Sequence, residues 1–186
     1  MSFRFCPSCG AGDPAFLDGK RWHCRYCGFE YFHNVATAAG IILDRSGEIV
    51  FIERAREPRR GKLGLPGGFV DPGERAEDAA IRECREEVGW APPVLDFLGS
   101  FPNSYAYGGV SYNTCDLFFY YRFGADALLP PLAPNDGEAL LIRTIALARV
   151  PEEELAFPSI VRALDEYRAF LSPTRPRRAA LGPAAP

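Results

Sequence analysis

The sequence predicts a domain of the α/β class that follows a small cysteine-rich module, and three observations support this. Four of the six cysteines lie within the first 27 residues, strand-like segments begin at residue 36, and two later segments have the apolar spacing of helices. A chain of 186 residues with 47% hydrophobic residues can bury one main core beside an accessory module. We therefore expect the module at 1–33, the main domain at 34–172 and a disordered, proline- and alanine-rich tail at 173–186.

Composition and charge exclude several classes of protein. No apolar run approaches the roughly 20 residues that cross a bilayer, and the first residues lack the long apolar region of a signal peptide. We therefore expect a soluble, cytoplasmic protein without a membrane partner. The formal net charge of -3 gives no general attraction to nucleic acid, so anion binding has to come from a local cluster or a metal.

The cysteine-rich module contains two Cys-x-x-Cys pairs. Cys6 and Cys9 form the first pair, and Cys24 and Cys27 form the second, each followed by a glycine that allows a tight turn. This spacing is typical of a zinc ribbon, in which four thiolates complete a tetrahedral site. Because the protein fills all four positions, we expect a structural Zn²⁺ that supplies on the order of 10 kcal/mol of folding free energy. Reduced cysteines paired by chance are the alternative, and the spacing disfavours it.

The main domain is predicted to alternate strands and helices. The expected elements, in order, are strands 36–43 and 48–54, helix 75–88, strands 94–101 and 112–123, strand 140–145, and helix 158–171. The first two strands form a hairpin, and Gly89 ends the first helix. A loop of Gly, Ser, Asn and Tyr is expected between the strands that end at 101 and begin at 112.

The first predicted helix carries three glutamates on one face. At 100° per residue, Glu83, Glu86 and Glu87 fall within about 100° of one another. Like charges this close cost roughly a few tenths of a kcal/mol per pair, and Mg²⁺ or Mn²⁺ would offset that cost because both prefer carboxylate oxygens. The alternative is a solvated acidic face on which Arg82 and Glu86 form an ordinary ion pair. Glu74, just ahead of the helix, is placed to pair with Arg82.

Residues Gly68 to Gly89 read G-x5-E-x7-R-E-x2-E-E-x-G, which resembles the complete signature of the Nudix hydrolases. The resemblance covers roughly residues 35–171 and implies an α/β/α sandwich around a mixed sheet. It also implies metal-dependent cleavage of the pyrophosphate in a nucleoside diphosphate linked to another moiety, giving a nucleoside monophosphate and a phosphorylated product. Matched by position, Glu83, Glu86 and Glu87 resemble the family's Mg²⁺ ligands, and the Gly68 carbonyl a further one.

A zinc ribbon joined to a Nudix domain is similar to the branch of NADH pyrophosphatase-like and ADP-ribose pyrophosphatase-like enzymes. The NADH-cleaving members carry a motif S-Q-P-W-P-F-P-x-S soon after the signature. Here Gly99 to Ser104 read GSFPNS, which looks like that motif with Gln-Pro-Trp-Pro deleted. This departure argues against NADH as the preferred substrate and leaves ADP-ribose and FAD-type compounds open.

Hydrolysis also needs a group that accepts a proton from water. A carboxylate near like charges has a raised proton affinity, which suits Glu83 or Glu86 for the role. Glu138, in a later loop ahead of a predicted strand, is a further candidate, and an exposed loop acid without function is its alternative.

Three residues are candidates for substrate contact. Arg54 belongs to a basic stretch that could meet phosphates, although a solvated loop is the simpler interpretation in an arginine-rich chain. Tyr105 and Tyr112 could stack on a base or pack at a strand edge.

Two classes of function remain. The intact glutamate set favours an enzyme that acts on a small-molecule nucleotide. The alternative is a regulatory module whose ribbon binds RNA or protein, with NAD-capped RNA as a further substrate. Nucleic acid is not favoured, because a basic run argues for it only when aromatic residues are interleaved. A homodimer formed through the ribbon is equally compatible with the sequence.

Overall fold

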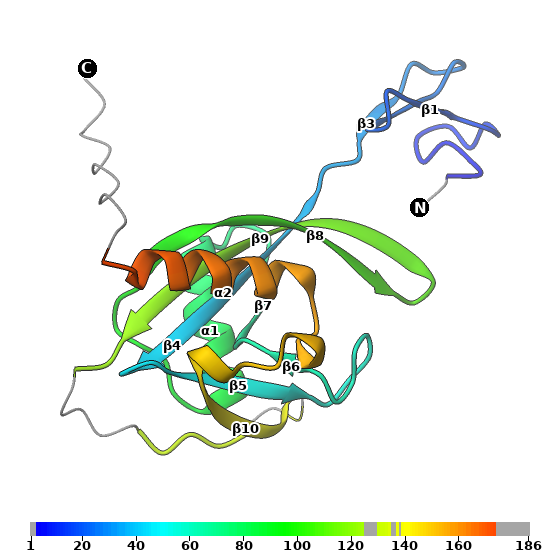
Figure 1. The fold of residues 1–186 in the computed structure, drawn as a ribbon. Coiled ribbons are helices and arrows are strands. Elements are labelled where there is room, and N and C mark those ends of the chain that lie inside the picture. The colour runs from blue at the N-terminus through cyan, green and yellow to red at the C-terminus, as the bar shows by residue number, and fades with distance from the viewer. Residues whose placement is uncertain (1–2, 125–129, 135–136, 138, 174–186) are drawn as a thin grey trace.

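The chain forms two β-sheets, which a computed structural model describes over residues 3–124, 130–134, 137 and 139–173. The larger sheet has seven strands in the order β10-β5-β4-β9-β8, with β6 beside β5 and β7 beside β4 (Figure 1). Their bounds are β4 Ala36–Arg45, β5 Glu48–Arg54, β6 Leu63–Gly64, β7 Gly67–Phe69, β8 Asp96–Tyr107, β9 Val110–Arg122 and β10 Ala139–Ala146. The sheet is mixed, because β4 and β9 run parallel while β8 and β9 run antiparallel.

Two helices, α1 (Ala76–Val88) and α2 (Pro158–Leu171), cover opposite faces of this sheet (Figure 1). The alternation of side chains along β4 explains the two cores: Ile41 packs in the cluster that contains α1, and Ile42 packs in the cluster that contains α2. The predicted α/β/α sandwich is therefore confirmed. Two short 3₁₀ helices, Leu147–Arg149 and Glu152–Glu154, connect β10 to α2.

The predicted hairpin of β4 and β5 is paired only near its turn, where Asp44 lies opposite Ile49. Further along, β4 pairs with β7 instead, through Ala38–Gly40. The exchange of partner brings the backbone of Gly67 and Gly68 to the C-terminal half of α1, which places the glycines of β7 beside the helix that carries the glutamates.

The predicted loop between residues 101 and 112 is wrong. Strand β8 continues to Tyr107 and β9 begins at Val110, so the two form one long hairpin. Gly108 and Gly109 make its two-residue turn with φ of 58° and 77°, the positive values that such a turn needs. The polar composition of the segment concealed the strands, and the Gly-Gly pair was the signal that could have revealed them.

The smaller sheet lies near the N-terminus and has three short antiparallel strands, β1 (Ala15–Leu17), β2 (Arg21–His23) and β3 (Glu30–Phe32). Trp22 is buried at its centre and contacts Phe16, with ring centroids 4.7 Å apart. The division of the chain at 33/34 and 172/173 stays a prediction, and residues 174–186 lie outside the described part. Among the described residues, no helix has the length and apolar character needed to span a bilayer.

Candidate active site

A cavity of about 280 Å³ lies where β4, β7, β8 and β9 meet the C-terminal half of α1 and the start of α2. Strand β4 forms the floor of the cavity, where the small residues Ala38 and Gly40 do not fill the space. A Cβ at Gly40 would lie 2.8 Å from the Phe118 ring, so only glycine fits there without moving that ring.

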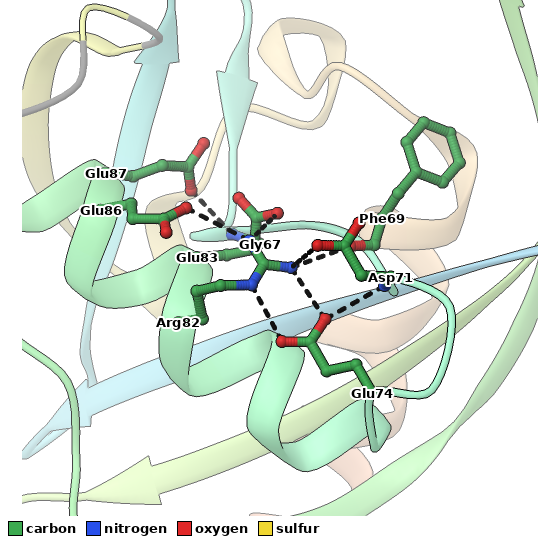
Figure 2. A network of polar contacts seen from close by, with 8 residues as sticks. All are labelled: Gly67, Phe69, Asp71, Glu74, Arg82, Glu83, Glu86 and Glu87. Carbon is green, nitrogen blue, oxygen red and sulfur yellow. Dashed lines mark hydrogen bonds and ion pairs between the residues drawn. The ribbon is translucent and has the colours of Figure 1, made fainter.

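The backbone of β7 and the glutamates of α1 form one wall of the cavity. The Gly67 N–H donates a hydrogen bond to the Glu87 carboxylate at 2.8 Å, and Glu87 is only 3% exposed (Figure 2). Beside it, Gly68 faces Glu83 so closely that an added Cβ would lie 2.5 Å from the carboxyl carbon. The absence of a side chain at Gly68 is therefore what lets the Glu83 carboxylate approach the backbone.

Arg82 holds the acidic residues of this wall in place. Its Nε donates to Glu74 at 2.9 Å, and its Nη1 donates to Glu83 at 2.8 Å and to Glu86 at 3.2 Å (Figure 2). Hydrogen bonds from Arg82, with one from the Asp71 N–H, lower the pKa of Glu74 to about 2. The same bonds to Glu74 and Glu83 raise the pKa of Arg82. A guanidinium thus offsets part of the like-charge repulsion between Glu83 and Glu86.

A polar cluster that the sequence analysis missed forms the opposite wall. The Asp116 carboxylate accepts hydrogen bonds from Thr114 Oγ1 at 2.6 Å, from Ser159 Oγ at 2.6 Å and from Asn103 Nδ2 at 2.9 Å. All four residues line the cavity, and Asp116, Thr114 and Ser159 are buried. Polar residues at alternate positions of a strand that is otherwise apolar on that face could have revealed the cluster.

Three aromatic rings border the cavity between these two walls. Phe69 meets Tyr105 edge to face with centroids 5.3 Å apart, and Tyr105 lies 5.6 Å from Phe157. The Arg54 guanidinium sits 5.2 Å above the Phe157 ring, and its Nε donates to the Pro58 carbonyl at 3.0 Å. The rings give the cavity an apolar side between an anionic wall and a polar one.

The NUDIX domain family matches residues 33–170, which is most of the chain. The chain belongs to the NUDIX family. Among curated relatives, it is 41% identical over 71 residues to an ADP-ribose pyrophosphatase of Methanocaldococcus jannaschii, covering 38% of this chain and 41% of that protein. It is 30% identical over 160 residues to the NAD-capped RNA hydrolase NudC of Pseudomonas aeruginosa, covering 78% of this chain and 56% of that protein. The chain thus spans from about two fifths to just over half of the length of these relatives.

Solved structures agree on the fold of this NUDIX protein. A NUDIX hydrolase from Nitrosomonas europaea matches with a TM-score of 0.60 at 22% identity, over 90% of this chain and 93% of that one. The NUDIX domain of Shewanella oneidensis NrtR, solved with ADP ribose, matches with a TM-score of 0.58 at 19% identity, over 76% and 91%. These likenesses show the fold alone, whereas the match of the NUDIX domain family confirms the resemblance that the signature indicated.

The predicted site residues divide into three groups in this NUDIX fold. Gly68, Glu83, Glu87, Arg54 and Tyr105 all line the cavity. Two others do not line it: Glu86 has a side chain 49% exposed and pairs with Arg82, and Tyr112 lies opposite Tyr105 on the neighbouring strand. Glu138 lies outside the described residues. Their roles as ligands, base and substrate contacts stay predictions.

The four paired cysteines come together beside the small sheet, in the turn that precedes β1 and the turn between β2 and β3. Their sulfur atoms all lie within 4.8 Å of one another, with 3.7 Å from Cys6 to Cys27 and 3.7 Å from Cys9 to Cys24. Each pair bends through a glycine, Gly10 or Gly28, whose φ is 73° and whose N–H returns to the carbonyl of the first cysteine at 2.9 Å. Two equal turns aimed at one point are what a zinc ribbon requires.

Proposed function

We propose that the chain hydrolyses the pyrophosphate bond of a nucleoside diphosphate linked to another moiety, such as ADP-ribose, releasing a nucleoside monophosphate. The observation that carries this proposal is the wall on which Glu83 and Glu87 meet the backbone of Gly67 and Gly68 inside one cavity. The names of the relatives, an ADP-ribose pyrophosphatase and an NAD-capped RNA hydrolase, support the same substrate class.

The wall fits a hard divalent cation such as Mg²⁺ or Mn²⁺. Carboxylate and carbonyl oxygens are the donors that these ions prefer, and the cradle between Gly68 and Glu83 has no room for a side chain. We propose the Glu83, Glu86 and Glu87 carboxylates and the Gly68 carbonyl as the ligands. Glu83 and Glu87 line the cavity, whereas Glu86 does not and would have to turn toward it. Such an ion neutralises phosphate charge and lowers the pKa of a bound water.

The protein's own residues would orient the reaction. The Gly67 N–H fixes the Glu87 carboxylate, and Arg82 fixes Glu83, so neither acid has to be ordered when substrate arrives. We propose Glu83, Glu86 or Glu138 as the acceptor of the proton from the attacking water. Single Gln substitutions separate them, because loss of the base removes one limb of the pH–rate profile.

Substrate preference follows from the shortened motif. Residues 99–104 form part of the regular strand β8, so the four missing residues leave no loop of their own. The aromatic residue and prolines that NADH-cleaving relatives carry are therefore missing from this pocket. One lost apolar wall is typically worth roughly 1 to 3 kcal/mol, so we expect ADP-ribose or FAD to be cleaved at least as well as NADH.

The experiment is a panel of ADP-ribose, NADH, NAD⁺, FAD, diadenosine polyphosphate and NAD-capped RNA, assayed with Mg²⁺ or Mn²⁺ and analysed for AMP. We expect metal-dependent release of AMP, with kcat/KM for ADP-ribose at least equal to that for NADH. A hundredfold preference for NADH would contradict the proposed substrate preference. The absence of cleavage across the panel would contradict the proposed reaction.

We further propose that the cysteine cluster binds Zn²⁺ as a structural ion. A tetrahedral site with Zn–S bonds of about 2.3 Å has sulfur–sulfur edges of about 3.8 Å. The two 3.7 Å separations match those edges, and the cysteines are not joined in disulfides. The donor set and its spacing thus fit zinc.

A second candidate function is RNA binding by the ribbon. The ribbon exposes several aromatic rings, among them Tyr26 at 65% and Phe32 at 51%, and Arg25 lies 5.0 Å over the Tyr26 ring. Exposed rings beside arginine can stack on single-stranded bases. Tyr26→Ala should then lower kcat/KM for NAD-capped RNA and leave that for NAD⁺ unchanged. Equal effects on both substrates, or no effect on either, would exclude RNA binding by the ribbon. Light scattering of the same protein tests the alternative that the ribbon forms a homodimer.

A further inference from the structure

The Asp116 cluster on the second wall of the cavity has no part in the function proposed so far. It joins three elements, because Asn103 comes from β8, Thr114 and Asp116 from β9, and Ser159 from the first turn of α2. A buried carboxylate is costly to desolvate, and apolar residues would join the same elements at least as well. Because the cluster lines the cavity, its position points to a role in ligand binding.

The hydrogen-bond geometry fixes what the cluster offers to a ligand. An ionised carboxylate only accepts, so the hydroxyl protons of Thr114 and Ser159 and one amide proton of Asn103 are directed at Asp116. The hydroxyl oxygens and the Asn103 carbonyl oxygen then keep lone pairs. The cluster presents mainly acceptors around a buried negative charge.

This polarity selects the kind of group that can bind there. Phosphate oxygens also accept hydrogen bonds and carry negative charge, so the cluster repels them. A neutral group that donates hydrogen bonds, a ribose hydroxyl or the amino group of adenine, satisfies the free lone pairs. The aromatic rings of Tyr105 and Phe157 beside it can pack against a sugar or a base.

The strand register sets the separation between strand β7, whose backbone borders the glutamates, and the Asp116 cluster. Ala38 of β4 pairs with Phe69 of β7 on one side and with Asp116 of β9 on the other. Neighbouring strands lie about 4.8 Å apart, so the Cα atoms of Phe69 and Asp116 are about 10 Å apart. Because Ala38 is small, nothing bulky on β4 separates them. The glutamates of α1 and the cluster line the same cavity, so a substrate whose pyrophosphate lies at the glutamate wall can extend its neighbouring neutral part to the cluster.

We propose that Asn103, Thr114, Asp116 and Ser159 form a specificity-determining subsite that accepts hydrogen bonds from the neutral, donor-bearing part of the substrate next to its pyrophosphate. The inference rests on the proposed hydrolase function, and it assigns to these residues substrate selection rather than a role in the chemical step. Asp116 orients the two hydroxyls. Ser159 is fully buried, so the Thr114 hydroxyl and the Asn103 amide oxygen make the contact.

The test compares kcat/KM for ADP-ribose with that for three analogues that each lack one donor. IDP-ribose replaces the base amino group by a carbonyl and carries an N–H at N1 instead. 2′-deoxy-ADP-ribose lacks one hydroxyl of the adenosine, and ADP-2-deoxyribose lacks one of the terminal sugar. The wild type should disfavour at least one analogue by about tenfold or more. In Asp116→Asn the hydroxyl protons lose their fixed direction, so that preference should fall to within about threefold. The analogue that the wild type disfavours identifies the substrate group that donates the hydrogen bond.

Three further variants separate substrate selection from stability. Asp44→Asn is the matched control, because Asp44 is also buried and accepts a 2.6 Å hydrogen bond from Tyr167 but does not line the cavity. It should lower Tm and leave the substrate ratios unchanged. Thr114→Val should lose the preference, whereas Thr114→Ser, which keeps the hydroxyl, should retain it.

The outcomes distinguish this inference from the proposed function. If the wild type cleaves ADP-ribose but treats all three analogues alike, the subsite is wrong while the hydrolase function stands. The same holds if Asp116→Asn lowers Tm and slows every substrate equally. If the wild type cleaves none of them, the proposed function itself fails, and calorimetric titration with ADP-ribose then shows whether the wild type binds it more tightly than Asp116→Asn.

Discussion

At the scale of single residues, the glutamate wall depends on two adjacent glycines that are needed for different reasons. A Cβ at Gly67 would lie 2.2 Å from the Ala39 carbonyl oxygen, and the φ of 150° is one that side chains rarely adopt. The three atoms nearest to a Cβ at Gly68 all belong to the flexible end of the Glu83 side chain. Gly67 is therefore needed for the fold, and Gly68 is needed for the position of the Glu83 carboxylate.

The two alanine variants should separate these roles. Gly67→Ala should lower the free energy of unfolding by about 3 kcal/mol or more, because the clash is with backbone. Gly68→Ala should cost about 1 kcal/mol or less in stability, yet lower kcat/KM for ADP-ribose by about 100-fold, because it displaces Glu83. Denaturant unfolding and steady-state kinetics on both variants check this. If the two variants lost stability and activity in the same proportion, the two glycines would not have these separate roles.

At the scale of elements, α1 is held to the preceding loop by Arg82 and Glu74. Their hydrogen bonds lower the pKa of Glu74 to about 2 from its ordinary value of 4.5, so the ionised acid favours the folded state. This contribution is fully present above pH 4.5 and is lost as the pH falls toward 2.

Glu74→Gln should therefore be less stable than the wild type at pH 7, and the difference should shrink as the pH falls below about 4.5. Denaturant unfolding at pH 7, 5, 4 and 3 measures the two free energies side by side. Glu77→Gln, on the exposed first turn of α1, is the control and should show a smaller difference at pH 7. A Glu74→Gln difference that stays constant with pH would mean that the ion pair does not stabilise the fold.

The sequence predicted most elements, because their side chains follow a clear period. Helix α2 was predicted with its bounds, and α1 ends at Gly89 in the left-handed conformation expected of a cap. The β8–β9 hairpin was missed beyond residue 101, since its polar residues hide the alternation of a strand. The exchange of β5 for β7 beside β4 depends on contacts between distant segments, which no local pattern contains.

The candidate site shows the same limit. Helical spacing placed Glu83, Glu86 and Glu87 on one face, but the structure separates them by environment. Glu87 is buried against the Gly67 N–H, whereas Glu86 is half exposed and bonded to Arg82. Asp116 was not predicted at all, because its partners lie on three elements that only the folded chain brings together.

At the scale of the whole molecule, the described residues form two sheets with separate means of stabilisation. The larger sheet has an apolar core on each face, whereas the cysteine-rich module has few buried side chains, among them Cys6, Trp22 and Cys24. A segment of this size folds stably only with a metal or another constraint.

Removal of zinc should therefore unfold the ribbon and spare the larger domain. Cys24→Ser should reduce bound zinc from about one per chain and should lower kcat for ADP-ribose by no more than about twofold. Elemental analysis and steady-state kinetics check both points. Zinc-free wild-type protein, or loss of activity together with zinc, would contradict this division of roles.

The most direct test of the central claim is the dependence of kcat for ADP-ribose on Mg²⁺ concentration, measured for the wild type and for Glu83→Gln. We predict that the wild type needs the ion and releases AMP, and that Glu83→Gln keeps its Tm while its kcat falls by about 100-fold or more. Near-normal turnover by Glu83→Gln, or wild-type turnover without a divalent ion, would show that the wall of glutamates beside Gly68 is not the site of cleavage.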